Sequence, residues 1–214
     1  MQQKALIRIL TPYLMVGFFI LTTAPKSNSQ EIIPYSPPTP NGFIGFGMGV
    51  NDYGLGLGAE ISLNNNLWVY GMGGYSTWGY RLTGGLTYYP GRNGYSSSFS
   101  LGYSYASGEK DFVTELDVEN TYSYYSEPEE QEVTLDLNPI NTINLIYSYN
   151  VRVGRNSKFV FSTGYAISLT DNIYKNKTKY FWGKDLTDGS KDFIKFMAPG
   201  GIIIGIKYMI GGFK

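Results

Sequence analysis

Charged side chains that could act together are few in this sequence, and they lie in segments that alternate apolar with small or polar residues. The formal charges within those segments are Glu60, Arg81, Arg152 and Lys207. Each falls on the small, polar register of its segment, so the four share one side of a sheet. One carboxylate and three cations predict a partly buried network, completed by Asn144, Asn150 and tyrosine hydroxyls. Such a network either satisfies buried charge alone or serves as a gate or ion path.

Covalent and metal chemistry find little support in the composition. The 214 residues include no cysteine and no histidine, which removes disulfides, thiolate metal sites and the most common general base. A serine without an adjacent base is a weak nucleophile, and no cluster of lysine or carboxylate bases stands out. We therefore expect no catalytic residues, no cofactor, no metal site and no enzymatic activity. Basic and acidic residues number 17 each, so the net charge gives no case for nucleic acid binding.

The charges are positioned by eight segments whose side chains alternate with period two, which is the pattern of β-strands. We expect these strands at about residues 43–50, 53–63, 67–75, 78–88, 95–105, 142–153, 159–169 and 201–211. No helical periodicity of any length follows residue 42. The strand lengths suit a bilayer, which a tilted strand crosses in about 9 to 11 residues. Short turns at one end and long loops at the other are typical of outer-membrane barrels.

The stretch FIGFGMGVNDYGLGLGAEISL, residues 43–63, indicates what the two sides of this sheet require. Glycine takes every second place in both halves, and mostly large apolar residues fill the places between. A membrane-spanning barrel turns its apolar side outward and its small or polar side inward. The interior of eight strands is just wide enough for side chains to fill, so glycine keeps it from overfilling. We predict an all-β fold, an eight-stranded antiparallel transmembrane up-and-down β-barrel over residues 42–214.

Two other strands bear on the interior. The third has an ambiguous register, because both of its sides contain large apolar residues. Its two sides are Trp68, Tyr70 and Met72 against Leu67 and Val69. In the fourth, Trp78 falls on the apolar side together with Tyr80, and we expect both to point outward.

Residues 1–29 differ from the rest in composition. A basic start, an apolar run from Ile9 to Leu21 and a polar, small-residue exit predict a signal peptide that is cleaved before Gln30. The alternative is an uncleaved N-terminal anchor, although a spanning helix needs about 20 apolar residues. Residues 30–41 hold four prolines, which favour extended backbone without ladder hydrogen bonds. We expect this Pro-rich leader to lie exposed in the periplasm.

Two long polar segments interrupt the strand pattern. Residues 107–132 hold nine acidic residues and one lysine, a net charge of −8, whereas residues 170–198 have a net charge of +2. Because 112–118 and 132–138 still alternate, we expect the fifth and sixth strands to extend as a protruding hairpin. Residues proposed for its tip are Tyr122, Tyr124, Tyr125, Glu127, Glu129 and Glu130. The two segments could pair across the barrel mouth.

This extracellular hairpin is a candidate binding surface. An exposed, acidic and tyrosine-rich strand pair can accept a protein partner's strand by β-augmentation. Its oxygen-only ligands leave calcium binding open as well. A solvated surface loop without a ligand explains the same composition.

The pattern over residues 42–214, with aromatic residues near the strand ends and Phe213 one place from the C-terminus, resembles a known family. It is similar to the small outer-membrane β-barrels of Gram-negative bacteria, typified by outer membrane proteins A, W and X, without a signature motif. The glycine and tyrosine content and Gln30 resemble the Bacteroidetes-type members. The resemblance implies a place among outer-membrane lipid and assembly by the barrel-insertion machinery through a terminal aromatic strand. Lys214 after Phe213 departs from that pattern.

The expected function is a structural or interaction role in the cell outer membrane. The protein would act through extracellular loops 107–138 and 170–198, or as an accessory subunit of a larger outer-membrane complex. The alternative is a narrow channel for small solutes or ions, although eight strands leave little free bore. Enzymes in similar small barrels rely mostly on a histidine, which this chain lacks. A soluble lipocalin-like barrel is the runner-up fold, but it would need an apolar interior and a charged exterior.

Overall fold

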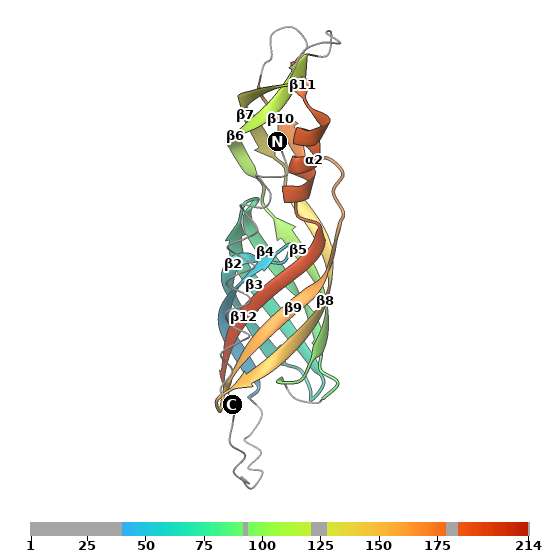
Figure 1. Cartoon of the computed structure of the whole chain (residues 1–214). Helices are drawn as coiled ribbons and strands as arrows, with labels where there is room; N and C mark the ends of the chain where they lie inside the picture. Colours follow the sequence, from blue (N-terminus) through green and yellow to red (C-terminus); the bar gives the residue numbers. More distant parts are fainter. Residues whose placement is uncertain (1–39, 92–93, 121–127, 179–183, 214) are drawn as a thin grey trace. The chain divides into compact units, whose positions relative to one another are not determined.

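The computed structural model describes residues 40–91, 94–120, 128–178 and 184–213. Its barrel strands are β1 (Gly42–Val50), β2 (Gly54–Ser62), β3 (Leu67–Ser76), β4 (Gly79–Tyr88), β5 (Ser98–Ala106), β8 (Ile140–Val153), β9 (Ser157–Ser168) and β12 (Gly201–Phe213). They close in the order β1-β12-β9-β8-β5-β4-β3-β2, and neighbours run antiparallel (Figure 1). The all-β, eight-stranded antiparallel barrel predicted from the sequence is confirmed.

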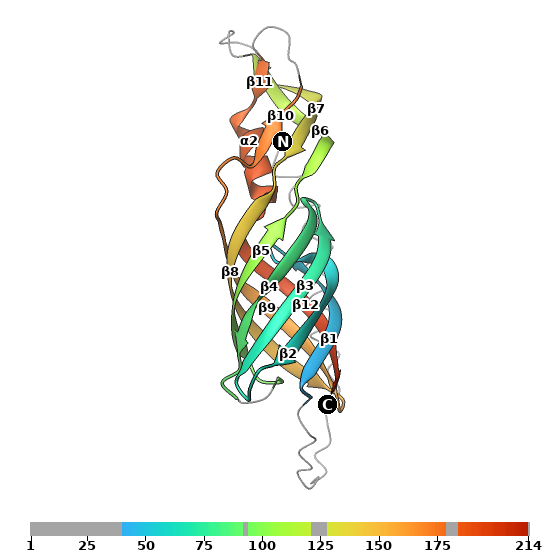
Figure 2. The ribbon, with the colours of Figure 1, turned by 180° about the vertical axis from the view of Figure 1, so that it is seen from behind.

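The barrel closes where the first strand meets the last. β1 pairs with β2 on one edge and with β12 on the other, so that Val50 lies opposite Ile204 (Figure 2). Side chains alternate between the two faces of the wall as the sequence predicts. Leu57 and Leu101 point outward and are 70% and 56% exposed, whereas Asn144 points inward and is fully buried. The wall is therefore apolar outside and polar inside, the reverse of a soluble barrel.

Bulky residues of β3 fill much of the interior and resolve its ambiguous register. Trp68, Tyr70 and Met72 all point inward and are buried. The inward glycines of neighbouring strands leave room for such side chains. A Cβ at Gly58 would lie 2.7 Å from Met72 Cγ, and a Cβ at Gly102 would collide with the Tyr70 hydroxyl. The alternating glycines of the first strands therefore make space inside a crowded barrel.

Contrary to the prediction, β5 and β8 do not continue outward as one long hairpin. β6 (Glu109–Asn120) and β7 (Glu129–Leu137) pair with each other, but they belong to a second sheet with the order β10-β7-β6-β11. Gly108, with a φ of +73°, turns the chain between β5 and β6. Pro139, which has no N–H for a ladder, separates β7 from β8. We call this second sheet, together with the helix at residues 188–197, the cap.

The second polar segment supplies both edges of the cap sheet. β10 (Tyr174–Asn176) pairs with β7 and β11 (Lys184–Leu186) pairs with β6, so the two segments join as the sequence suggested. Lys177, just after β10, has its Nζ 2.9 Å from a carboxylate oxygen of Asp111 and 2.9 Å from one of Asp136. The backbone N–H of Asp111 and the Lys177 ammonium hold the pKa of Asp136 below its ordinary range. These contacts fasten β10 to the acidic hairpin.

A helix also lies in the second polar segment, where the sequence predicted none. Helix α2 (Asp188–Met197) begins after Thr187, whose hydroxyl oxygen accepts a hydrogen bond from the Ser190 backbone N–H. Only Ser190 and Ile194 of this helix are buried. Its apolar residues, Phe193, Ile194, Phe196 and Met197, all fall within five positions, so the helical pattern is too short to stand out in a polar segment.

The cap and the barrel rim share one apolar core. Val133 and Leu186 of the cap cluster with Trp78 in the short turn between β3 and β4. Trp78 is therefore buried instead of pointing outward beside Tyr80, and its indole N–H donates to Asn138 O at 2.9 Å. The prediction failed here because strand alternation stops at a turn, where the side chain is free to point toward the cap.

The inward and outward glycines provide a direct test of crowding in the barrel. Valine at Gly102 would overlap the Tyr70 side chain, whereas a Cβ at Gly71 meets nothing within 4 Å. We expect Gly102→Val to lower the free energy of unfolding by about 1–3 kcal/mol through overpacking. Gly71→Val, the matched control, should be neutral or stabilising because valine favours strands. Urea unfolding of the refolded protein in detergent measures both, and equal effects would contradict this packing.

Candidate functional site

A buried ion pair lies inside the barrel toward the end where β1 begins. Lys158 Nζ is 2.8 Å from Glu60 Oε2, and the two residues are 0% and 6% exposed. The Tyr89 hydroxyl donates to the same carboxylate oxygen at 2.8 Å. Lys158 also donates to Tyr89 Oη at 2.9 Å and to Gly94 O at 2.8 Å. The ammonium group thus uses all three of its hydrogen-bond donors, and the pair is satisfied within the protein.

Aromatic side chains surround this ion pair. The Phe43 and Trp68 rings have centroids 5.6 Å apart, and the Trp68 and Tyr89 rings are 5.5 Å apart. Lys158 Nζ also lies 4.2 Å from the centroid of Phe43, within the range of a cation–π interaction. Met209 completes the same buried cluster. The layer fills the lumen at this level and excludes water from the pair, which strengthens its electrostatic attraction.

The β1–β2 turn, residues 51–53, folds into the lumen from the other end. Asp52 and Tyr53 are fully buried although they belong to a three-residue connection. Arg81 Nη2 donates to Asn51 O at 2.9 Å, and Thr83 Oγ1 donates to Asp52 O at 2.9 Å. Asn51 adopts a φ of +59°, a left-handed conformation that asparagine tolerates better than most residues. The turn therefore serves as a plug held by hydrogen bonds from β4.

Polar groups near this turn are less completely satisfied than the ion pair. Both carboxylate oxygens of Asp52, Arg81 Nε and Tyr70 Oη are buried without a hydrogen-bond partner among the described residues. Lys207 Nζ lies 3.5 Å from Met72 Sδ, a weak acceptor. Buried polar atoms without partners lower stability. Trp68 Nε1 and Asn150 Oδ1, nearer the ion pair, also lack a partner among the described residues, so complete hydrogen bonding belongs to the ion pair itself and not to one half of the lumen.

The predicted charge network is present in part. Three of its four members are buried inside the barrel, namely Glu60, Arg81 and Lys207. The prediction for Arg152 is wrong. Its side chain is exposed, its Nη2 donates to Arg155 O at 2.7 Å, and its guanidinium lies 4.5 Å from the centroid of Tyr95. Arg152 is opposite Lys158 at the end of the ladder, and the Lys158 ammonium already occupies the lumen, so a second buried cation would be repelled.

Sequence reasoning missed two lumen charges. Lys158 lies an even number of positions from Ser162, so both side chains are on the polar side of the strand. The expected strand began at residue 159, one residue too late to include Lys158. Asp52 lies in a turn, for which alternation predicts no direction. Asn144 and Asn150 are buried as expected. They bond to hydroxyl and backbone groups, including Ser104 Oγ and Ser96 O, and no bond to a charged side chain is found for them among the described residues.

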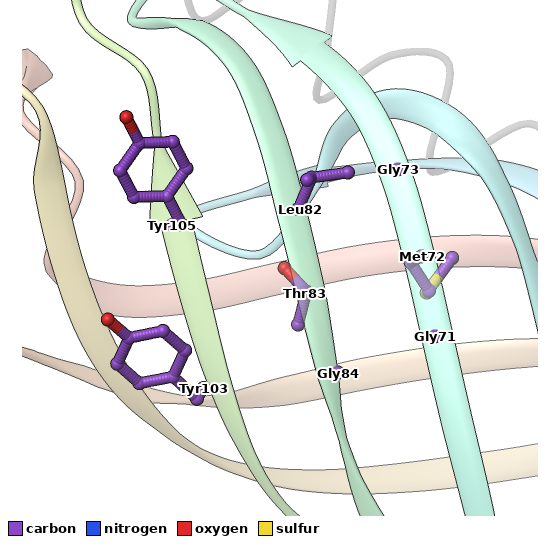
Figure 3. Close-up of a pocket in the computed structure, with 8 residues that line it drawn as sticks. All are labelled: Gly71, Met72, Gly73, Leu82, Thr83, Gly84, Tyr103 and Tyr105. Carbon is purple, nitrogen blue, oxygen red and sulfur yellow. The ribbon is translucent and has the colours of Figure 1, made fainter.

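A hollow of about 570 Å³ lies on the outward side of the wall, over β3 and β4 (Figure 3). Its lining includes Gly71, Gly73, Leu82, Gly84, Tyr103 and Tyr105. The two tyrosines stand on β5 at one side of it. Two outward positions of β3 at the hollow are glycine, Gly71 and Gly73, whereas Val69 and Tyr75 on the same side of the strand are large and exposed. The hollow therefore lies on the outer surface of the strand whose large side chains fill the interior.

The two faces of the cap sheet differ in chemistry. One face contributes Leu116 and Val118 to the apolar core that includes Ile194 of α2. The other face has carboxylates in directly opposed pairs. These pairs are Glu115 with Glu132 and Asp117 with Glu130. Like charges in opposed positions destabilise a sheet, so folding stability does not account for this face.

The residues predicted at the tip of the extracellular hairpin fall into two groups. Four lie outside the described residues: Tyr122, Tyr124, Tyr125 and Glu127. Glu129 and Glu130 lie at the start of β7, where they face Val118 and Asp117. Within the described residues, no group of three or more acidic side chains is arranged to hold a metal ion.

Comparison with protein-family models gives no match, and comparison with curated proteins gives none either. The resemblance to small outer-membrane barrels therefore stays an expectation. Among the described residues, no helix is long and apolar enough to cross a membrane.

Removing one member of the buried ion pair should lower the free energy of unfolding strongly, and removing both members should restore most of it. Lys158→Met removes one partner and leaves Glu60 charged in an aromatic layer, so we expect a loss of about 3–5 kcal/mol in unfolding free energy. The double change Lys158→Met with Glu60→Gln removes both charges and should recover most of that loss. Tryptophan fluorescence during urea unfolding in detergent micelles measures each variant.

The exposed Arg152 provides the control for this experiment. Arg152→Met removes a cation of similar size from the same end of the barrel and should change stability by no more than about 0.5 kcal/mol. If the double variant were as unstable as Lys158→Met, the two side chains would not be acting as a pair.

Proposed function

We propose that this protein is an outer-membrane β-barrel with a structural or interaction role. The chain would be exported through a cleaved signal peptide at residues 1–29, with residues 30–41 as a periplasmic leader. The barrel-insertion machinery would then place it in outer-membrane lipid. The inverted wall, apolar outside and polar inside, is the observation that carries this proposal. The cap, built from the two long polar segments, would face the outside of the cell.

The outward wall supports the membrane location. Every barrel strand exposes large apolar side chains, from Phe46 on β1 to Ile204 on β12. Soluble monomers rarely expose continuous apolar patches larger than a few hundred Å². The charged residues of the strands that are buried inside, such as Glu60 and Lys207, would be costly on a lipid-facing wall. Apolar side chains on the outer wall and charged side chains in the lumen are the arrangement expected of a barrel surrounded by lipid hydrocarbon instead of water.

The packed lumen favours an interaction role over a channel. The aromatic layer with the Glu60–Lys158 pair fills one half, and the turn 51–53 fills the other. Solutes would need both plugs to move. A narrow channel stays the alternative, because Asp52, Arg81 and Lys207 give the second half a polar lining.

The hydroxyl groups inside the barrel support a role without catalysis. Thr83 Oγ1 lies 2.7 Å from Ser104 Oγ, and Ser148 Oγ lies 3.1 Å from Ser162 Oγ. Hydroxyls paired with one another have no base to activate them as nucleophiles.

The cap is the part best suited to meet a protein partner. Its acidic face, defined by Glu115, Asp117, Glu130 and Glu132, lies on the side of the sheet opposite the apolar core. Opposed carboxylates lower the stability of the free sheet, but they attract a cationic surface and would favour its binding. A partner with lysine or arginine side chains at matching spacing would relieve that repulsion.

The membrane location predicts a strong dependence on where a charge is placed. Leu101→Arg puts a cation on the outward barrel wall, where we expect a loss of about 2–4 kcal/mol in folding stability in vesicles. Val113→Arg, the matched control, places the same charge at a similarly exposed apolar residue of the cap and should change little. Folding into lipid vesicles, scored by the mobility shift of unboiled protein on a gel, tests both. Equal behaviour of the two variants would contradict insertion of the barrel.

The interaction role predicts a large native particle. Protein extracted from its own membrane in mild detergent should have a mass well above one barrel with its detergent. Replacing Glu115 and Glu132 by glutamine should reduce that mass to a single barrel without altering the mobility shift of the unboiled protein. A wild-type particle of one barrel that conducts steadily in a planar bilayer would support the channel instead.

A further inference from the structure

A groove of about 1170 Å³ lies between the end of α2 and the barrel rim. The tips of β1 and β2, the turn between β3 and β4, and the start of β12 form one side, and residues 195–197 form the other. The connection from β1 to β2 adds no loop above the rim, because residues 51–53 fold into the lumen. The groove is distinct from the buried ion pair and from the acidic face of the cap.

One half of this groove continues the outward wall of the barrel. Its apolar lining includes Val50, Leu55, Tyr165, Ile202 and Ile204, all of them exposed. Phe196, at the end of α2, is 85% exposed and lines the same groove. A largely exposed phenylalanine at the upper edge of an apolar wall suits the boundary between hydrocarbon and headgroups. An acyl chain can therefore pass from the wall into the groove without leaving apolar surroundings.

The other half of the groove is cationic. Among the described lining residues the charged ones are Arg81 and Lys195, and both are positive. Arg81 is 3% exposed, and its Nε lacks a hydrogen-bond partner among the described residues. Lys195 Nζ lies 3.2 Å from Asp192, an exposed pair of little strength that a phosphate can replace. The nearby Asp52 carboxylate offsets part of the charge of Arg81, so Lys195 is the more available cation.

We infer that this groove binds an anionic phospholipid of the surrounding membrane. One acyl chain lies along the wall between Val50 and Ile204, and the phosphate sits below α2 near Lys195 and Arg81. Guanidinium and ammonium groups favour phosphate oxygens through charge-assisted hydrogen bonds. A free phosphate would leave the apolar half unused, and a neutral lipid would leave the cations unused. This inference rests on the proposed membrane location, which it extends to a particular class of lipid.

Trp78 lines the groove and provides a native reporter. With Trp68 and Trp182 replaced by phenylalanine, fluorescence reports Trp78 alone. The protein is folded into phosphatidylcholine vesicles that contain equal small fractions of either brominated phosphatidic acid or brominated phosphatidylcholine, since bromine quenches tryptophan at short range. We expect stronger quenching by the anionic lipid. Lys195→Gln should lower the preference for phosphatidic acid about fivefold, which corresponds to one cation near a headgroup.

Lys191→Gln is the matched control, because Lys191 lies on the same helix but pairs with Asp185 and does not line the groove. It should leave the preference unchanged. Arg81→Gln should also lower the preference, and Lys195→Gln decides the question if the Arg81 variant fails to fold. Equal quenching by the two lipids in inserted protein, or no effect of Lys195→Gln, would overturn the groove alone. Failure to float with the vesicles would overturn the membrane location and the inference with it.

Discussion

An eight-stranded barrel encloses a space only just wide enough for side chains, and in this protein the inward residues of β3 occupy much of it. The inward side chains of β3 face glycines. Met72 faces Gly58 of β2, Tyr70 faces Gly102 of β5, and Trp68 packs against Gly94 in the turn before β5. On the outward side, Gly71 and Gly73 of β3 with Gly84 of β4 leave the hollow over the two strands. The positions of the glycines therefore determine both the packing of the interior and the relief of the outer surface of this wall.

The limited volume also determines how the interior handles charge. The Glu60–Lys158 pair has every ammonium donor bonded and is enclosed by aromatic rings, so its desolvation is offset by hydrogen bonds. At the other end Asp52 enters from a turn and finds cations nearby without direct bonds to its carboxylate among the described residues. A fully bonded ion pair and buried polar groups with spare hydrogen-bonding capacity thus coexist in one lumen.

The sequence was most informative where a repeating physical rule applied. Period-two alternation located the barrel strands, and the cost of charge on an apolar wall correctly placed Glu60, Arg81 and Lys207 inside. The same rule failed at turns, which have no alternation, so Asp52 and the burial of Trp78 were not predictable. Arg152 and Lys158 compete for one position across a ladder, and only the three-dimensional register decides between them. The hairpin of the cap and its pairing with the second polar segment were expected, but its separation from the barrel sheet was not, because Gly108 and Pro139 interrupt the strands there.

The inward turn of the first hairpin has a consequence for assembly. The Tyr53 hydroxyl donates to Ile206 O on β12 at 3.2 Å, a bond between residues 153 positions apart. Contacts of such large sequence separation form late, after the chain between them has been ordered. A barrel whose turn stayed outside would lack this bond at its seam, so filling the interior and sealing the wall become a single step.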